Sequence, residues 1–306
     1  MSNDEMTRRE FMRRALTLGL TAYGLAELAG MDELQAAAGG GSTIAVASSK
    51  SPGPLVRAAV DALGGMGAFV KPGASVLVKP NIGWAREPHQ AATTNPDVVA
   101  EIVRLCKQAG AREVKVMDHP VDGPDALVLN VSGIRAAAEK AGARVIPASS
   151  PALYEKVKLP RGKALKSADV LRDLRRADVF INVPIAKVHG TTTLTLGCKN
   201  LMGTVWDRGA WHRSASLDQA IADYAAHVAP QLVILDAIKI LLTKGPKGPG
   251  RTATKNIVVA GADQLAVDAY GATLFGRKPT SIAHLKRAYE MGVGELDLDR
   301  VKVTHV

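Results

Sequence analysis

The stretch that decides the fold runs over Ala177–Gly203 and reads "ADVFINVPIAKVHGTTTLTLGCKNLMG". Its first part is a short run of β-branched and other apolar residues, which is typical of a buried strand. The apolar pattern then gives way to polar and charged side chains, among them Lys187 and His189. In α/β proteins, ligands bind beyond the carboxyl ends of such strands, so this stretch predicts both a sheet and a binding site.

Similar short apolar runs recur along the chain and predict further strands. They are "STIAVAS" (42–48), "ASVLVKPN" (74–81), "REVKVMD" (112–118), "ARVIPAS" (143–149), "QLVILDAI" (231–238), "KNIVVAG" (255–261) and "RVKVTHV" (300–306). Helical patterns lie between them, as in 95–110 with Asn95 as its candidate N-cap, in 216–230 and in 262–276. We therefore expect an α/β fold with a mostly parallel sheet and helices on both faces.

The domain organisation is open to two interpretations. Residues 43–150 and 151–306 are predicted to form an N-terminal and a C-terminal α/β half, either as two sub-domains with a cleft between them or as one domain. The boundary is soft because the polar segment 152–167, "ALYEKVKLPRGKALKS", reads either as a hairpin insertion or as a link between sub-domains.

The composition limits the class of protein. With 306 residues, 47% of them apolar, the chain is long enough for an ample core, and no run approaches the ~20 apolar residues of a membrane span. The formal net charge of +10 suits an acidic small molecule or an anionic lipid, or serves solubility alone. Nucleic acid is not expected as a partner, because aromatic residues make up only 4% and no binding motif is present.

The N-terminal segment predicts export. Arg8 and Arg9 are followed by Phe11 and a weakly apolar segment, and Ala36–Ala38 fits a small-residue cleavage pattern. This run resembles a twin-arginine (Tat) export signal, with an amphipathic helix as the alternative. We therefore expect residues 1–38 to be a signal peptide recognised by the Tat translocase, and the mature chain to be periplasmic or otherwise exported.

The chain contains two cysteines, Cys106 and Cys198. A [4Fe–4S] cluster is not expected, because such a cluster normally takes four thiolates. The two residues could form one disulfide in an oxidising compartment, but the sequence does not establish that pairing.

Polar residues follow several of the predicted strands. They are Lys79 and Asn81, then Asp118, then Lys187 and His189, and finally Asp236. A single aspartate after a strand is more often a helix cap than a catalyst, whereas four polar strand ends favour one shared cleft.

A second group of candidates comes from the end of the opening stretch. Lys199 and Asn200 stand where a helix begins after Gly197, and we expect both to be exposed. Ammonium groups and backbone N–H groups at such a place suit a phosphate or a carboxylate. The neighbouring threonines alone would be explained by capping and β-propensity, but beside two lysines they favour an anion or cofactor site.

Further candidates lie downstream. "WDRGAWHRS" (206–214) adds Arg208 and His212, and "LLTKGPKGPGRT" (241–252) is either a lid that brings Lys244 over an anion or a solvated turn. His212 and Asp236 could be metal ligands from separate loops, although no known metal motif is present.

Several of these segments together resemble a known family. "VKPN" (78–81), "INVPIAKVHGTTTLTLGCKNLMG" (181–203), "LVILDAIKILLTKGPKGPG" (232–250) and "ADQLAVDAYGA" (262–272) are similar to the domain-of-unknown-function family 362, from about residue 43 to the C-terminus. The resemblance implies an α/β fold and, in many relatives, an added cysteine-rich ferredoxin-type segment that this chain lacks. It also points to Asp268 as a candidate, with a buried hydrogen-bonding role as the alternative.

Three functional hypotheses follow. The first is an exported enzyme that acts on a small anionic substrate with a metal or organic cofactor; the second is a non-catalytic periplasmic binding protein; the third is an assembly partner of an exported redox complex. In the first, the catalytic candidates are His189, Asp118 and Lys187. The candidates for holding the ligand are Lys79, Asn81, Lys199, Asn200, Arg208 and Lys244, and those for a metal are Asp236 and His212.

Overall fold

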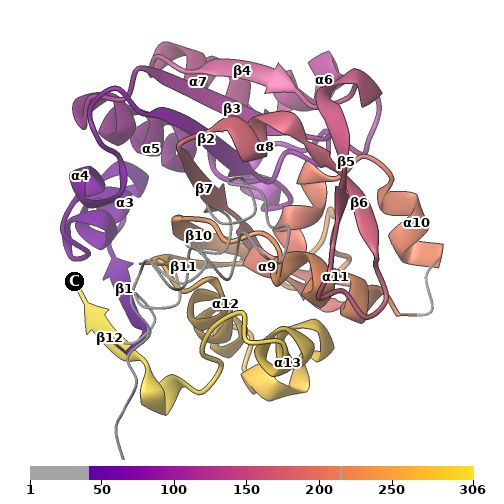
Figure 1. The fold of residues 1–306 in the computed structure, drawn as a ribbon. Coiled ribbons are helices and arrows are strands. Elements are labelled where there is room, and N and C mark those ends of the chain that lie inside the picture. The colour runs from indigo at the N-terminus through magenta and orange to yellow at the C-terminus, as the bar shows by residue number, and fades with distance from the viewer. Residues whose placement is uncertain (1–40, 214–215) are drawn as a thin grey trace, which may run out of the picture. The chain divides into compact units, whose positions relative to one another are not determined.

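The computed structural model describes residues 41–213 and 216–306 (Figure 1). The predicted signal peptide, residues 1–38, lies outside the described residues. Ser42–Val306 form one compact unit. Among the described helices, none is both long and apolar enough to cross a membrane.

The unit is built around one large sheet whose main strands follow the order β12-β1-β11-β10-β7-β2-β3-β4. These strands are β1 (Thr43–Ser48), β2 (Ser75–Pro80), β3 (Glu113–Asp118), β4 (Arg144–Pro147), β7 (Val179–Val183), β10 (Leu232–Leu241), β11 (Thr252–Gly261) and β12 (Lys302–His305). Only β11 runs antiparallel to its neighbours, β1 and β10, while the other pairs in this order are parallel. The prediction of an α/β fold with a mostly parallel sheet is therefore confirmed.

The helices occupy the connections between the strands. The α-helices are α3 (Pro52–Asp61), α4 (Met66–Phe69), α5 (Pro96–Gln108), α6 (Asp125–Val131), α7 (Ile134–Lys140), α8 (Arg172–Arg176), α9 (Gly197–Asn200), α10 (Arg208–Arg213), α11 (Leu217–Ala225), α12 (Gln264–Thr273) and α13 (Ala283–Glu290). Short 3₁₀ helices are η1 (Pro88–Gln90), η2 (Pro151–Leu153), η3 (Leu201–Thr204), η4 (Pro279–Ser281) and η5 (Leu298–Arg300). Asn95 caps α5 as predicted, because its side chain accepts a hydrogen bond from Asp97 N at 2.9 Å.

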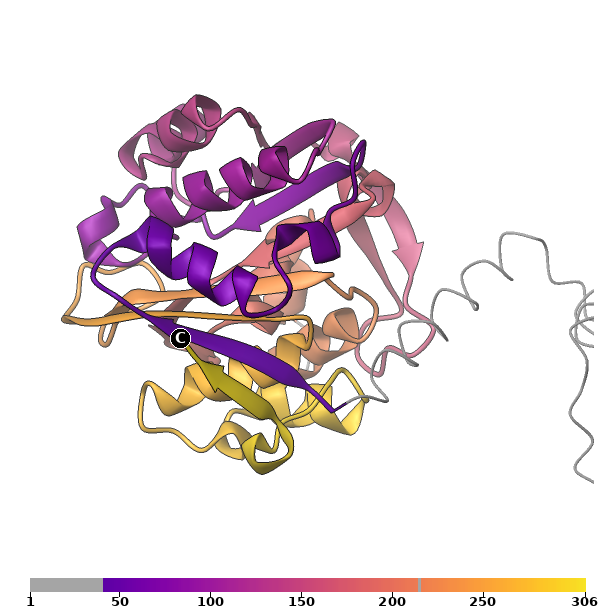
Figure 2. The same ribbon diagram turned by 90° about the vertical axis from the view of Figure 1, so that its left-hand side faces the viewer.

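Both faces of the sheet are covered at its central strands, which explains why β2, β7 and β10 are buried along almost their whole length. Successive side chains of a strand point to opposite faces. In β2, Val76 and Val78 pack in the core that contains the apolar residues of α3 and α5, whereas Leu77 packs in the core that contains those of α11 and α12. Figures 1 and 2 show α3 on one side of β1 and β11, and α12 on the other.

The strand predicted in the first part of Ala177–Gly203, "ADVFINVPIA" (177–186), breaks at Pro184 into two. Proline has no N–H to donate to a neighbouring strand, and β7 ends at Val183 while β8 (Ile185–His189) begins after it. The strand β8 then pairs with β10 and with the short β9 (Thr193–Thr195), which the sequence did not predict. This break carries Lys187 and His189 beyond the end of β7.

The two predicted halves contribute to the same sheet. The strand β7 of the C-terminal half lies between β10 and β2, and its Asn182 is in register with Lys79 of the N-terminal half. Segment 152–167 forms most of the hairpin of β5 (Tyr154–Lys158) and β6 (Ser167–Leu171), which is a separate antiparallel pair. Both ranges thus belong to the compact unit Ser42–Val306, and most of the polar segment lies in the β5–β6 hairpin.

The two cysteines do not pair. Both are free and buried, and they lie in the cores on opposite faces of the sheet, Cys106 on α5 and Cys198 on α9. Burial raises the pKa of Cys106 to about 12 and that of Cys198 well above its ordinary value, so both thiols remain protonated.

Candidate functional site

A cleft of about 480 Å³ lies beyond the carboxyl ends of β2 and β3, beside β8 and α9. Nine of the twelve side chains that the sequence nominated line this cleft. They are Lys79, Asn81, Asp118, Lys187, His189, Lys199, Asn200, Arg208 and His212. The structure therefore brings together residues up to 133 positions apart in the sequence, from Lys79 to His212, as expected for strand ends that meet at one edge of a sheet.

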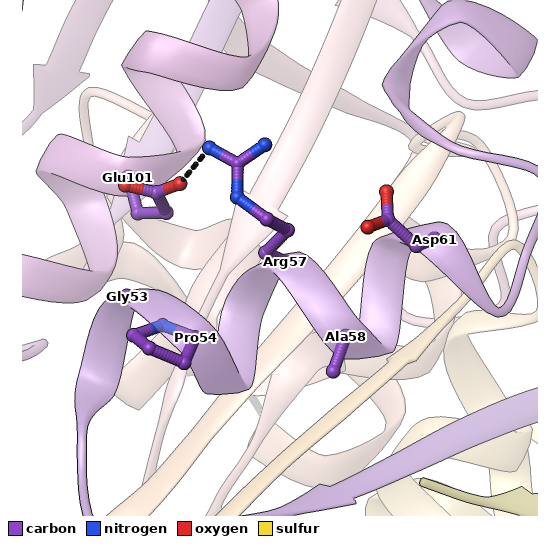
Figure 3. A pocket seen from close by; sticks show the side chains of 6 residues that line it. All are labelled: Gly53, Pro54, Arg57, Ala58, Asp61 and Glu101. Carbon is purple, nitrogen blue, oxygen red and sulfur yellow. Dashed lines mark hydrogen bonds and ion pairs between the residues drawn. The ribbon is translucent and has the colours of Figure 1, made fainter.

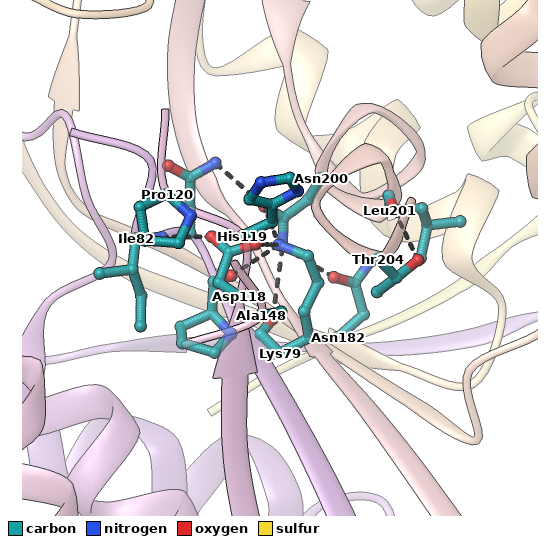
Figure 4. Close-up of polar contacts among 12 residues, drawn as sticks. Lys79, Ile82, Asp118, His119, Pro120, Ala148, Asn182, Asn200, Leu201 and Thr204 are labelled. Atoms are coloured by element: carbon teal, nitrogen blue, oxygen red, sulfur yellow. Dashed lines mark hydrogen bonds and ion pairs between the residues drawn. The ribbon is translucent and has the colours of Figure 1, made fainter. Parts of the chain in front are cut away.

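Lys79 and Asp118 form a buried ion pair at the floor of the cleft (Figure 4). The distance from Lys79 Nζ to Asp118 Oδ1 is 2.7 Å, and both side chains are almost completely buried. The second carboxylate oxygen accepts a hydrogen bond from Ile82 N at 2.6 Å. Burial lowers the pKa of Lys79, and the charge of Asp118 opposes that shift. Asp118 thus fixes Lys79 and the loop that follows β2.

This ion pair requires a glycine at position 203. A Cβ atom on Gly203 would lie 2.0 Å from Asp118 Oδ1 and 2.7 Å from Lys79 Nζ, far inside van der Waals contact. The backbone after α9 therefore approaches the pair closely because residue 203 has no side chain.

Asn200 bonds Lys79 and Asn182 through its side-chain amide (Figure 4). Its Oδ1 accepts hydrogen bonds from Lys79 Nζ at 3.1 Å and from Asn81 Nδ2 at 3.0 Å. Its Nδ2 donates to Asn182 Oδ1 at 2.8 Å. Asn200 is 2% exposed, so the expectation that it would be exposed is wrong: its amide is required inside the network.

Lys187 is buried at the floor of the cleft and has no acidic hydrogen-bonding partner. Its Nζ donates to Asn81 Oδ1 at 3.0 Å and to the carbonyl oxygen of Ala92 at 2.5 Å. Burial, followed by the positive charge of Lys199, lowers the pKa of Lys187 to about 7. At neutral pH a substantial fraction of Lys187 is therefore a neutral amine, with two N–H groups for its two acceptors and a lone pair left over.

Lys199 and Arg208 supply positive charge to the same cleft. Among the residues that the structure describes, none forms a hydrogen bond or ion pair with the Lys199 ammonium group. Burial, followed by the charge of Arg208, lowers the pKa of Lys199 to about 8. Arg208 donates to the carbonyl oxygens of His119 at 2.8 Å and Pro120 at 3.0 Å, which fix its guanidinium group without neutralising it. The lining thus contains Lys79, Lys187, Lys199 and Arg208 against the single carboxylate of Asp118.

His189 is oriented by the loop that follows it. The backbone N–H groups of Thr191 and Thr192 donate to His189 Nδ1 at 3.1 and 3.3 Å. Because Nδ1 accepts both bonds, the neutral ring carries its proton on Nε2. Burial, followed by the charges of Lys199 and Lys187, lowers the pKa of His189 to about 3. The geometry favours a hydrogen-bond donor over the proton-transfer role that the sequence suggested.

The N-terminus of α9 holds a carboxylate that belongs to the protein itself. Asp268 of α12 accepts hydrogen bonds from Gly197 N at 2.5 Å and Cys198 N at 2.8 Å. The expectation that these backbone groups bind an external anion is therefore wrong. Burial raises the pKa of Asp268 to about 7. Asp268 has the buried hydrogen-bonding role that was its alternative, and it fixes the turn that carries Lys199.

Asp236 and Lys244 do not line the cleft. Both carboxylate oxygens of Asp236 accept backbone hydrogen bonds, from Asn95 N at 2.7 Å and Ile238 N at 3.1 Å, and burial raises its pKa to about 6. His212 lines the cleft and is exposed. The structure therefore does not join Asp236 and His212 in a metal site. Across the described residues, no group of three or more His, Cys, Asp or Glu side chains is placed to hold a metal ion.

The segment 241–252 reaches the cleft through other residues than predicted. Lys244 is exposed, whereas Pro246 lines the cleft. Lys247 forms an ion pair with Asp122 at 3.0 Å and lies 5.7 Å from the centre of the Trp84 ring.

Trp84 and Gly203 of the cleft lining were not predicted from the sequence. Trp84 was missed, although it stands only three residues after the nominated Asn81 in "NIGW". No sequence signal identified Gly203, because its role depends on a contact across the fold.

A second, smaller hollow lies between α3 and α5 (Figure 3). Glu101 accepts a hydrogen bond from Arg57 at 2.6 Å and also binds Arg104, so these charges are paired. The remaining charged group of the lining is the exposed Asp61, so the hollow lacks the cluster of positive charge that the cleft has.

Known proteins that are similar to this chain include the following two. The chain is 30% identical over 251 residues to "Thylakoid-associated protein sll1697" of Synechocystis sp. (strain ATCC 27184 / PCC 6803 / Kazusa), an alignment that covers 78% of this chain and 74% of that protein. The lactate racemase apoprotein from Thermoanaerobacterium thermosaccharolyticum superposes with a TM-score of 0.48 at 13% identity. That superposition covers 78% of this chain and 57% of the other, so the chain spans less than two thirds of it.

The family model described as "Domain of unknown function (DUF362)" matches residues 76–273. This range includes the whole cleft lining from Lys79 to Pro246 and almost two thirds of the chain. The protein therefore belongs to the DUF362 family.

Proposed function

We propose that the cleft binds a small organic anion, a carboxylate or a phosphate ester, and that the protein is an enzyme in which Lys187 transfers a proton to or from that anion. The observation that carries the proposal is the unpartnered ammonium group of Lys199 beside Lys187 and Arg208, with one carboxylate in the lining and that one already bound to Lys79. Partly buried positive charge without a hydrogen-bonded counter-ion is costly, and the charge of Asp218 opposes only part of this cost at Lys199, so a bound anion would stabilise it.

The chemistry follows from the hydrogen bonds of Lys187. Asn81 and Ala92 take two N–H groups of the neutral amine, so its lone pair can accept a proton from a C–H or O–H group of the bound anion. The ammonium group that forms keeps both acceptors and can return the proton. Lys199 and Arg208 would stabilise the negative charge that develops on the substrate. His189 would donate a hydrogen bond from Nε2.

The binding part of the proposal is tested with inorganic phosphate and a panel of small carboxylates and phosphate esters. Calorimetry should detect binding to the wild type, and Lys199→Ala should weaken it about ten- to a hundred-fold, since a charge-assisted hydrogen bond contributes about 1.5–3 kcal/mol. The matched control is Lys244→Ala, which removes an exposed lysine outside the cleft. Equal effects of the two substitutions, or no binding to the wild type, would reject the proposal.

The catalytic part needs a separate measurement. Each anion that binds is incubated with the protein in D₂O, and NMR follows the exchange of its carbon-bound hydrogens. Exchange that depends on the wild type and is lost in Lys187→Met supports proton transfer. Binding without exchange or any other turnover would instead favour the non-catalytic binding protein.

We also propose that the chain is exported through the Tat pathway. The support comes from Arg8 and Arg9 before a weakly apolar segment, and from the small-residue pattern at Ala36–Ala38.

A further inference from the structure

The rim of the cleft differs chemically from its floor. Lys79, Lys187 and Asn200 at the floor are each no more than 2% exposed. At the rim, Trp84 and Pro246 are only partly buried, and Val121 is 54% exposed. Val121 is among the few large apolar side chains of the described residues that are exposed, and it is the one that lines the cleft. An exposed apolar group beside a ligand cleft points to an apolar contact with the ligand.

We propose that the anion bound in this cleft carries an apolar body, which packs against Trp84, Val121 and Pro246 while its charged group lies among the lysines. This inference rests on the proposed function and narrows its substrate class to amphipathic organic anions. Such a ligand would cover the rim and remove Val121 from water.

The size of the cleft supports an extended ligand. Its volume of about 480 Å³ lies within the range of about 300–1,000 Å³ that is typical of sites for drug-sized molecules. Inorganic phosphate, with five heavy atoms, would occupy a small part of this space. The charged lining residues lie at the floor and on α9 and α10, whereas Trp84, Val121 and Pro246 form the rim.

The apolar rim is held in place before any ligand binds. Lys247 lies over the Trp84 ring and forms its ion pair with Asp122, next to Val121. Arg86 Nε donates to the carbonyl oxygen of Lys247 at 3.2 Å, and Val121 N donates to Gly83 O at 2.9 Å. These contacts tie three loops together. Because Asp122 neutralises Lys247, the rim adds little attraction for the charged group and can select the body of the ligand.

The test compares straight-chain carboxylates from acetate to octanoate, with inorganic phosphate as a probe that has no apolar body. Each added methylene should strengthen binding by up to about fourfold until the rim is covered, which is the factor expected from burying one CH₂ group. Val121→Ser and Trp84→Ala should reduce this dependence on chain length and leave the affinity for phosphate unchanged. Tyr289→Ser, an exposed position on α13 outside the cleft, is the control.

The possible outcomes separate this inference from the proposed function. If phosphate binds but acetate and octanoate bind equally well, the apolar body is rejected and the anion site stands. If the dependence on chain length persists in both rim variants, the rim is not the contact and the inference fails. If neither phosphate nor any carboxylate binds, the proposed function itself fails. Val121 is exposed, so its substitution leaves the core intact.

Discussion

Asn200 of α9 joins Lys79 of β2 to Asn81 by accepting a hydrogen bond from each, at 3.1 and 3.0 Å. One amide oxygen thus connects helix α9 with the carboxyl end of β2 and with the loop that follows this strand. The Nδ2 group of the same amide donates to Asn182, so the side chain of Asn200 is held at both ends. Any movement of Asn200 would therefore also disturb its hydrogen bond with Lys79. The cleft floor is therefore a single network, and changes in it should affect stability and binding together.

The first prediction concerns the Lys79–Asp118 pair. Asp118→Ala should lower the free energy of unfolding by about 3–5 kcal/mol, because it leaves a buried ammonium group without its counter-charge. The double variant Lys79→Met with Asp118→Leu should lose less than Asp118→Ala alone, because no unpaired charge remains. Urea unfolding of the three proteins measures both effects. If the double variant is less stable than Asp118→Ala, the hydrogen bonds and packing of Lys79 stabilise the fold by more than an unpaired ammonium group costs.

A second prediction concerns Gly203. Gly203→Ala should destabilise the protein by about 1–3 kcal/mol or more, since the added methyl group must displace Asp118 and Lys79. Gly67→Ala is the control, because a Cβ atom at Gly67 meets nothing within 4 Å. Thermal melts with and without phosphate compare the two. Equal melting temperatures for the two variants would mean that the backbone after α9 can shift away from the ion pair.

The third prediction is a pH dependence that arises from Lys187. Its pKa is about 7 in the folded protein and about 10.4 in an unfolded chain. Between these values the unfolded chain holds a proton that the folded protein has released, so the free energy of unfolding rises with pH. Lys187→Met removes this contribution, whereas the similar one from Lys199 remains in both proteins. The free energy of unfolding of the wild type minus that of Lys187→Met should therefore increase from about pH 7 to pH 10. If the two free energies change in parallel with pH, Lys187 stays protonated in the folded protein.

The fourth prediction concerns the protonation of His189. With its pKa lowered to about 3 and two backbone N–H groups on Nδ1, the ring should stay neutral with its proton on Nε2 from pH 5 to pH 8. Long-range ¹H–¹⁵N spectra of the histidine rings, assigned with His189→Asn, report both the tautomer and any titration. Exposed His305 serves as a reference within the same spectrum. A titration of His189 near pH 6.5 would restore it as a proton-transfer candidate.

The fifth prediction concerns export. Arg8→Lys together with Arg9→Lys should trap the precursor in the cytoplasm, because the twin arginines are the feature that the Tat translocase reads. Fractionation and immunoblotting of cells that express either form measure the distribution. The control is Arg13→Lys together with Arg14→Lys, which changes two arginines outside the pair and should leave export intact. Normal export of the first double variant would remove the assignment.

Much of the fold could be predicted because the local patterns and the tertiary structure agree. The eight apolar runs are strands, and only the run at 177–186 is divided, at Pro184. The antiparallel position of β11 could not be predicted, because its buried apolar part, Val258–Gly261, is a short run that reads alike in either direction. The strand β9 was too short to give a pattern, with only Thr193–Thr195.

The site was predictable in its location and less so in the roles of its residues. Strand ends meet at one edge of a sheet, which is why the positions of Lys79, Asp118 and His189 pointed to one cleft. Asp236 follows the same rule in sequence, yet its carboxylate turns to the backbone of Asn95. Which neighbour a side chain bonds depends on contacts between distant segments, and these are absent from a single sequence.

The interleaving of the sheet has a consequence for dissecting the protein. The strand β7 lies between β10 and β2, so both parts of the chain contribute to the cleft. Lys79 and Asp118 precede the tip of the β5–β6 hairpin near Arg161, whereas Lys187 and Lys199 follow it. A chain cut at that tip would yield two pieces, each with an open sheet edge and neither with a complete anion site. Co-expression of the pieces should rebuild the cleft by complementation, and ligand binding would then report their reassembly.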